Sequence, residues 1–255
     1  MTIKASPKPI VFIASMPRCG SMWVYNVVRE LYSSVGITPW PETVPPRVDE
    51  LLAKVATTDP GTGRIWCIKT HNKIRAHADG IRVICPYRDV RDAMMSYMRF
   101  LGSTFEKALE IAEYMMQISD WYLQEETANV HAIPYDDIVD RAVETITSIS
   151  GFLGLTVEPE NIVDIAEHLS KEKVASRIAL LEQKSANRND SEGQACISLR
   201  NMDGNYRVYD SKTGFQGGHI GSSPDGAWRT ELSSDQRERL CRLTADWVKR
   251  YGFGE

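Results

Sequence analysis

Short apolar runs alternate along the chain with longer segments whose apolar residues recur at the spacing of a helix. The apolar runs lie at residues 10–15, 65–69, 83–86 and 130–134. Runs of this length are typical of strands that are buried on both faces of a parallel sheet. The other segments predict helices at residues 22–33, 90–101, 104–126, 138–153, 159–168 and 233–250. The pattern therefore predicts an α/β fold of one domain, a central parallel β-sheet flanked by helices.

Two stretches interrupt this alternation. Residues 38–63 are rich in proline around a short predicted helix near residues 48–55, and residues 183–227 are rich in Gly, Ser, Asn and Asp. Long polar segments inside a domain are often lids or binding loops, although simple surface insertions have the same composition. We therefore expect irregular loops near residues 38–63 and 183–227 within a single domain that spans residues 1–255.

Composition narrows the class of protein. With 255 residues, 42% of them hydrophobic, the chain is long enough for one sizeable core, and a net charge of −4 argues against general nucleic-acid binding. The five cysteines are odd in number and widely spaced, which favours a reducing compartment over a disulfide framework. A signal-peptide pattern and a membrane-spanning apolar run are both missing from the sequence. We expect a cytoplasmic protein without a membrane span.

The heptad at residues 17–23, which reads Pro-Arg-Cys-Gly-Ser-Met-Trp, is the first candidate site. It connects the first predicted strand to the first predicted helix, where backbone N–H groups and the helix dipole favour an anion. Gly20 allows close approach of an oxyanion, and Arg18 supplies a full positive charge. The Gly-Lys pair of the common nucleotide P-loop occurs nowhere in the chain, so the heptad predicts an anion site that differs from ordinary Mg-ATP sites.

A second candidate site follows the strand predicted at residues 83–86. Arg88 follows this strand after Tyr87, and Ser96 lies about two turns into the next predicted helix. The carboxyl ends of parallel strands meet at one edge of a sheet, where ligands of α/β proteins bind. Two anion sites at this edge suit a ligand with two separated phosphates.

At this point the chain resembles the sulfotransferases that use 3′-phosphoadenosine 5′-phosphosulfate (PAPS), particularly their soluble, cytosolic-type branch. The heptad is similar to the family's Pro-[Lys/Arg]-Ser-Gly-Thr-Thr-Trp, and residues 88–97 match its Arg-x-x-[Lys/Arg]-Asp-x-x-x-Ser-Tyr. Residues 69–71 read Lys-Thr-His, a motif that the family often carries, and residues 135–137 match the family's Tyr-[Glu/Asp]-Asp. Four matches in the family's order imply its P-loop-like nucleotide-binding architecture.

The resemblance also implies a donor, a product and their ligands. PAPS would be the sulfonate donor and 3′-phosphoadenosine 5′-phosphate (PAP) the product, with no metal required. Arg18 and the backbone of residues 19–23 would hold the 5′-phosphosulfate, and Arg88 and Ser96 the 3′-phosphate. The rings of Trp23 and Tyr135 would approach the adenine. The residues implied in donor binding are Arg18, Cys19, Gly20, Ser21, Met22, Trp23, Arg88, Ser96, Tyr135, His219 and Gly221.

The chain departs from the family pattern at two places. Where many members have Arg-Lys-Gly and then Gly-Asp-Trp-Lys, residues 219–221 read His-Ile-Gly and residues 226–229 read Gly-Ala-Trp-Arg, after a longer gap. Loss of the Arg-Lys pair leaves backbone donors and His219 for that contact with the 3′-phosphate. Met22 replaces a hydroxyl residue, so a hydrogen bond expected there must come from Ser21 or from the backbone.

Transfer of a sulfonyl group to a hydroxyl requires removal of a proton and stabilisation of negative charge. His71 is the candidate base, because a neutral imidazole is available near pH 7. Lys69 lies two residues earlier in an extended segment and should point to the same side. Arg18 would stabilise the departing phosphate. Glu42 is a rival base, since some branches of the family use a glutamate from a comparable region.

Two other functions stay open at this point. A P-loop-type kinase of small molecules would need a magnesium-binding Asp/Thr set that is not evident, and a catalytically silent PAP-binding protein would not need Lys69 and His71. The acceptor would be a small molecule with a hydroxyl or amine, whether a phenol, a sugar, a lipid or a secondary metabolite. The sequence does not decide the oligomeric state. We also expect Asp92 to cap or pair near its own helix and Trp228 to anchor the C-terminal loop.

Overall fold

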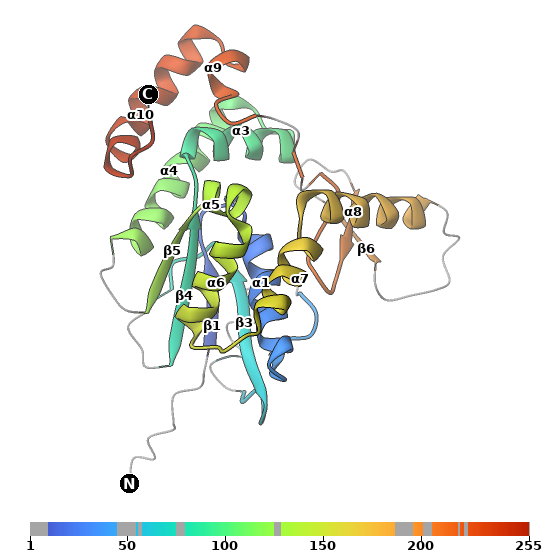
Figure 1. The fold of residues 1–255 in the computed structure, drawn as a ribbon. Helices are drawn as coiled ribbons and strands as arrows, with labels where there is room; N and C mark the ends of the chain where they lie inside the picture. Colours follow the sequence, from blue (N-terminus) through green and yellow to red (C-terminus); the bar gives the residue numbers. More distant parts are fainter. Residues whose placement is uncertain are drawn as a thin grey trace.

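Five parallel strands form the central sheet, in the order β2-β3-β1-β4-β5 (Figure 1). The computed structural model describes residues 10–44, 55, 58–74, 80–124, 129–186, 196–200, 206–218, 220–221 and 224–254. The strands are β1 (Ile10–Ala14), β2 (Thr38–Trp40), β3 (Arg64–Thr70), β4 (Ile81–Tyr87) and β5 (Val130–Pro134). The predicted α/β fold with a central parallel sheet is confirmed.

Helices flank the sheet as the sequence predicted, with differences at their boundaries. They are α1 (Ser21–Ser34), α3 (Val90–Leu101), α4 (Phe105–Leu123), α5 (Tyr135–Asp140), α6 (Ala142–Leu153), α7 (Pro159–His168), α8 (Lys171–Ala186), α9 (Trp228–Glu231) and α10 (Ser234–Arg250). The helix predicted at residues 138–153 is two helices, because Arg141 has a non-helical backbone with φ −136° and ψ 49°. Helix α8 was not predicted.

The two faces of the sheet bury different partners. Alternate residues of a strand point to opposite faces, so Val11 and Ile13 of β1 pack with α1, α6 and α7. Phe12 and Ala14 pack on the other face, in a cluster that includes Ile118 of α4. The register Ala14 to Thr70 between β1 and β3 places the ends of these two strands side by side. The segments that follow β1 and β3 therefore leave the sheet next to each other.

A further core joins α3, α4 and α10 at the edge where β1 and β4 end (Figure 1). Met16 and Cys19, from the loop after β1, are fully buried in it. Trp228 is 4% exposed, and the guanidinium groups of Arg91 and Arg229 each lie 4.3 Å from its ring. The expectation that Trp228 anchors the C-terminal segment is confirmed.

The two regions expected to be irregular contain regular structure. Residues 38–63 begin with β2, and residues 183–227 contain the antiparallel pair β6 (Cys196–Arg200) and β7 (Tyr206–Asp210). Buried Phe215, which follows β7, packs in the same core as α1. This tertiary contact has no counterpart in the local sequence pattern. Of the helix predicted near residues 48–55, only Val55 lies within the described residues.

Among the helices of the described residues, none combines the length and apolar character needed to cross a membrane.

Candidate active site

The loop between β1 and α1 has the backbone of an anion-binding turn. Arg18 and Gly20 both have left-handed φ values, 65° and 85°. Gly20 is the N-cap of α1 and has no side chain with which to cap the helix, so no cap side chain of its own covers the backbone N–H groups at this end. A Cβ atom at Gly20 would approach Ile138 Cδ1 to 2.9 Å and Tyr135 Cδ2 to 3.3 Å. Glycine at this position therefore meets both a conformational and a steric requirement.

Several side chains of the heptad are used for packing. The Sγ atom of Cys19 donates to the carbonyl oxygen of Met16 at 2.9 Å, and burial raises the pKa of this thiol to about 11. Met22 packs against Gly214, and Trp23 Nε1 donates to the carbonyl oxygen of Leu169 at 3.1 Å. These contacts fix the loop, while its backbone and Arg18 stay suited to anion binding.

Lys69 and His71 lie in contact at the end of β3. The Nζ atom of Lys69 is 2.9 Å from Nε2 of His71, and Nδ1 of His71 is 2.8 Å from the carbonyl oxygen of Ser15. A carbonyl oxygen only accepts, so Nδ1 carries the proton and Nε2 accepts from the lysine ammonium. The expectation that Lys69 and His71 point to the same side is confirmed, and the contact with Ser15 joins them to the loop after β1.

The electrostatic environment keeps the imidazole of His71 neutral. Burial lowers its pKa to about 3, and the positive charges of Lys69 and Arg18 act in the same direction. Burial also lowers the pKa of Lys69 to about 8, with a further lowering by Arg18. Near pH 7 this region therefore combines a neutral imidazole with two cations. The positive charge of Arg18 thus acts on both Lys69 and His71.

Ser96, which the resemblance implied as a ligand of the 3′-phosphate, forms a hydrogen bond with Arg18. The Nε atom of Arg18 donates to Ser96 Oγ at 3.0 Å, and its guanidinium lies 4.3 Å from the centre of the Phe100 ring. Ser96 is about 9 Å along α3 from the start of that helix, at 1.5 Å per residue. This rise brings its side chain to the β1–α1 loop.

Arg88 follows β4 and forms an ion pair with Asp225. Its side chain is 12% exposed, and its guanidinium lies 4.2 Å from the centre of the Tyr135 ring. Tyr135 also lies beside Gly20, since a Cβ atom at Gly20 would lie 3.3 Å from Tyr135 Cδ2. Tyr135 therefore connects the Arg88 region to the β1–α1 loop, as expected for a residue that belongs to the same site.

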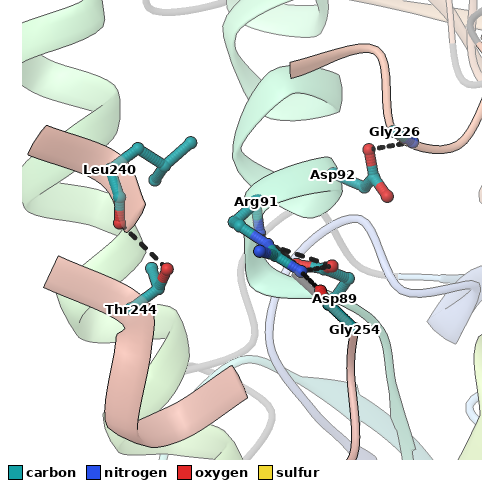
Figure 2. A network of polar contacts seen from close by, with 7 residues as sticks. All are labelled: Asp89, Arg91, Asp92, Gly226, Leu240, Thr244 and Gly254. Carbon is teal, nitrogen blue, oxygen red and sulfur yellow. Dashed lines mark hydrogen bonds and ion pairs between the residues drawn. The ribbon is translucent and has the colours of Figure 1, made fainter. Parts of the chain in front are cut away.

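Asp92 holds the same C-terminal segment against α3. Figure 2 shows its carboxylate facing Gly226, whose N–H donates to Asp92 Oδ1 at 2.8 Å. The cap of α3 is Asp89, whose side chain accepts from the N–H of Arg91, so Asp92 does not cap the helix and its pairing is the bond with Gly226. Burial raises the pKa of Asp92 to about 6. Asp225 and Gly226 are thus fixed on α3 and Arg88 by charged contacts.

The other candidates have less defined positions. Glu42 is exposed, and its backbone carbonyl accepts from Arg29 at 2.8 Å. Gly221 is exposed, and His219 lies outside the described residues. Sequence reasoning missed Asp225, although the neighbouring Gly-Ala-Trp-Arg segment at residues 226–229 could have directed attention to it.

Comparison with known proteins gives a family and a fold. The family described as Sulfotransferase domain matches residues 62–198, more than half of the chain. No curated protein matches the chain. The chain is similar to retinol dehydratase in complex with retinol and PAP, with 18% identity, a TM-score of 0.62, and coverage of 96% of this chain and 82% of that one.

Two other solved structures give the same result. Retinol dehydratase in complex with androsterone and inactive cofactor PAP has 17% identity and a TM-score of 0.62, with coverage of 96% of this chain and 82% of that one. Mouse sulfotransferase SULT7A1 complexed with PAP has 16% identity and a TM-score of 0.61, with coverage of 97% and 86%. At these identities the likeness shows a shared fold.

Proposed function

Because the chain belongs to the sulfotransferase domain family, we propose that it transfers a sulfonate group from PAPS to a hydroxyl or amine of a small molecule and releases PAP. The predicted enzyme class, a PAPS-dependent sulfotransferase, agrees with this family. The observation that carries the detailed proposal is the contact of Lys69 with His71, and of His71 with Ser15 in the segment that leads to Arg18. PAP is bound in the similar structures of retinol dehydratase and mouse SULT7A1, which supports PAPS as the donor.

The donor would bind across both ends of the site. The backbone N–H groups of Cys19, Gly20, Ser21, Met22 and Trp23, with Arg18, fit the 5′-phosphosulfate, since they lie at the start of α1. Arg88 is suited to the 3′-phosphate, and Ser96 contributes through its bond to Arg18. Tyr135, which contacts Arg88 and lies beside Gly20, would lie beside the adenine ring. His219 and Gly221 remain proposed further ligands of the 3′-phosphate.

In the transfer step, the acceptor oxygen forms a bond to sulfur while the bond from sulfur to the 5′-phosphate oxygen breaks. The electron pair of the broken bond leaves with PAP, and His71 Nε2 takes the acceptor proton. Nε2 accepts from Lys69 in this structure, so Lys69 must turn toward the sulfonyl oxygens as the proton moves. There its charge and that of Arg18 stabilise the negative charge that develops.

Donor binding would also prepare the base. The negatively charged phosphosulfate next to His71 would stabilise the protonated imidazole and oppose the effect of Lys69 and Arg18. The pKa of His71, which is about 3 without this anion, then rises toward its ordinary range. His71 would thus become an effective base when the donor is in place.

The acceptor is proposed to be a small molecule, since retinol and androsterone occupy the similar solved structures. Phenols, sugars, lipids and secondary metabolites are the classes to test. We further propose that residues 1–255 form one sulfotransferase domain.

The proposal is tested by incubating the protein with PAPS labelled in the sulfonate group and a panel of these acceptors, with and without a chelator. We expect label to appear on an acceptor at a rate that the chelator does not change. Calorimetry with PAP gives the affinity of the nucleotide independently. Chelator-sensitive phosphoryl transfer from ATP would identify a kinase, and PAP binding without transfer to any acceptor would indicate a silent binding protein.

A further inference from the structure

The segment that follows β3, residues 71–74, is held by three aromatic side chains of α4. An irregular segment that leaves a sheet loses the ladder partners of its backbone groups, which then need other hydrogen bonds. Tyr122 Oη accepts from the N–H of Ile74 and donates to the carbonyl oxygen of Asn72, both at 2.7 Å. The hydroxyl of Tyr122 thus bridges the backbone groups of Asn72 and Ile74.

Two neighbours of Tyr122 on α4 bond to the same segment. Trp121 Nε1 donates to the carbonyl oxygen of Ile74 at 2.8 Å, and Tyr114 Oη donates to the carbonyl oxygen of His71 at 3.1 Å. Trp121 and Tyr114 are 37% and 40% exposed, whereas Tyr122 is 1% exposed. The buried hydroxyl of Tyr122 is therefore the contact that water is least able to replace.

His71 is consequently fixed from two sides. Its ring is oriented by the bond from Nδ1 to Ser15, and its backbone is bonded to Tyr114 of α4. The ring of Tyr122 packs in the core between α4 and the sheet, together with Ile118. This core makes α4 a rigid support for the segment that carries His71.

We propose that Tyr122, together with Tyr114, is a positioning residue that holds the imidazole of His71 in place for the acceptor proton. This inference rests on the proposed function of His71 as the base. A displacement of about 1 Å at a reacting group can lower turnover by about a hundredfold, so a fixed backbone at residues 71–74 has a direct effect on catalysis.

The substitution Tyr122→Phe keeps the ring in the core and removes the hydroxyl. We expect kcat to fall by about ten- to a hundredfold, while the KM for PAPS and the affinity for PAP stay unchanged. Loss of the support should also expose His71 more to water, so its pKa, measured by NMR titration of the free protein, should rise toward the ordinary value. General loss of stability would not change the pKa of one histidine in the folded protein.

Tyr251→Phe is the matched control. The hydroxyl of Tyr251 donates to Asp120, which lies on α4 as Tyr122 does, at 2.7 Å. Among the hydrogen bonds of the described residues, it makes none with residues 71–74. This variant should keep the kcat and the His71 titration of the original protein. If Tyr122→Phe also keeps both, the inference is overturned.

Two further variants complete the test. If Tyr122→Phe does not fold, Tyr114→Phe changes an exposed hydroxyl and should lower kcat several-fold at unchanged KM for PAPS, and an unchanged kcat would overturn the inference. His71→Ala separates the inference from the proposed function. An inactive His71→Ala beside a fully active Tyr122→Phe rejects the positioning role alone, whereas a fully active His71→Ala rejects His71 as the base.

Discussion

The two ends of the candidate donor site balance their charges in different ways. Where β1 and β3 end, Lys69 donates to the imidazole of His71, which is neutral near pH 7, and Arg18 donates to the hydroxyl of Ser96. Where β4 ends, Arg88 forms an ion pair with the carboxylate of Asp225. The positive charge of Arg88 also acts to lower the pKa values of the carboxylates of Asp92 and Asp136.

This difference suits the first end to the transfer reaction and the second end to binding and release of the nucleotide. The neutral imidazole of His71 does not compensate the charge of Lys69, so this charge can act where negative charge would develop on the sulfonyl group. A carboxylate partner neutralises Arg88 until another anion replaces it. The first end should therefore determine turnover, and the second end should determine nucleotide affinity.

The strongest test of this comparison is His71→Ala at the first end. Loss of the base should lower kcat by about 10²- to 10⁴-fold, with little change in PAP affinity. Steady-state kinetics and calorimetry with PAP measure the two effects. His131→Ala is a control, since His131 bonds to Ser148 and stacks on Phe152 near the beginning of β5. Normal turnover of His71→Ala with loss of turnover in Glu42→Gln would move the base to Glu42.

Lys69→Met tests the charge at the first end and should lower kcat by about 10²- to 10³-fold. The pKa of Lys69 is about 8 in the free protein, so its ammonium is lost as the pH rises through 8. The profile of kcat/KM against pH, which reports the free enzyme, should therefore decline above pH 8. A similar decline in the Lys69→Met variant would assign it to another group.

Arg88→Ala tests the second end. We expect PAP binding to weaken by about 1.5 to 3 kcal/mol, the usual range for a hydrogen bond to a charged group. Adenosine 5′-phosphate, which lacks the 3′-phosphate, should bind both proteins equally in the same calorimetric titration. Equal weakening for both nucleotides would show that Arg88 does not contact the 3′-phosphate.

Asp225→Asn should have the smallest effect, in the opposite direction. Asp225 competes with the 3′-phosphate for Arg88, but its side chain is 60% exposed and exposed ion pairs contribute about 0 to 1 kcal/mol. PAP affinity should rise by up to about fivefold. Glu106→Gln, which removes an exposed partner of Arg239, is the matched control and should leave PAP affinity unchanged. Weaker PAP binding by Asp225→Asn would mean that this segment supports the nucleotide instead of competing with it.

The fold was largely predictable because its central strands are buried on both faces. Such strands must be continuously apolar, and this pattern located β1, β3 and β4 within a few residues. Strand β5 lies at the edge of the sheet with Ala132 exposed, and its short apolar run was sufficient to locate it. The antiparallel pair β6 and β7 was missed because its surroundings are rich in Gly, Ser, Asn and Asp, although Cys196–Arg200 and Tyr206–Asp210 partly alternate apolar and polar residues. Strand β7 also contacts α8. The break at Arg141 between α5 and α6 was also missed.

The residues of the candidate site were predicted from the sequence, but most of the contacts between them were not. The contact between Lys69 and His71 follows from their spacing in an extended segment. The bond between Arg18 and Ser96 and the ion pair between Arg88 and Asp225 join residues 78 and 137 positions apart. Only the packing of α3 on the loop and on the C-terminal segment brings these partners together.

The order of charged and glycine residues after each strand was sufficient to predict an anion-binding edge with two cationic centres. This was possible because strand burial and helix-start geometry are local properties of the chain. Which groups oppose each cation was decided by the tertiary structure. A charge responds to every group within a few ångströms, whatever its distance along the sequence.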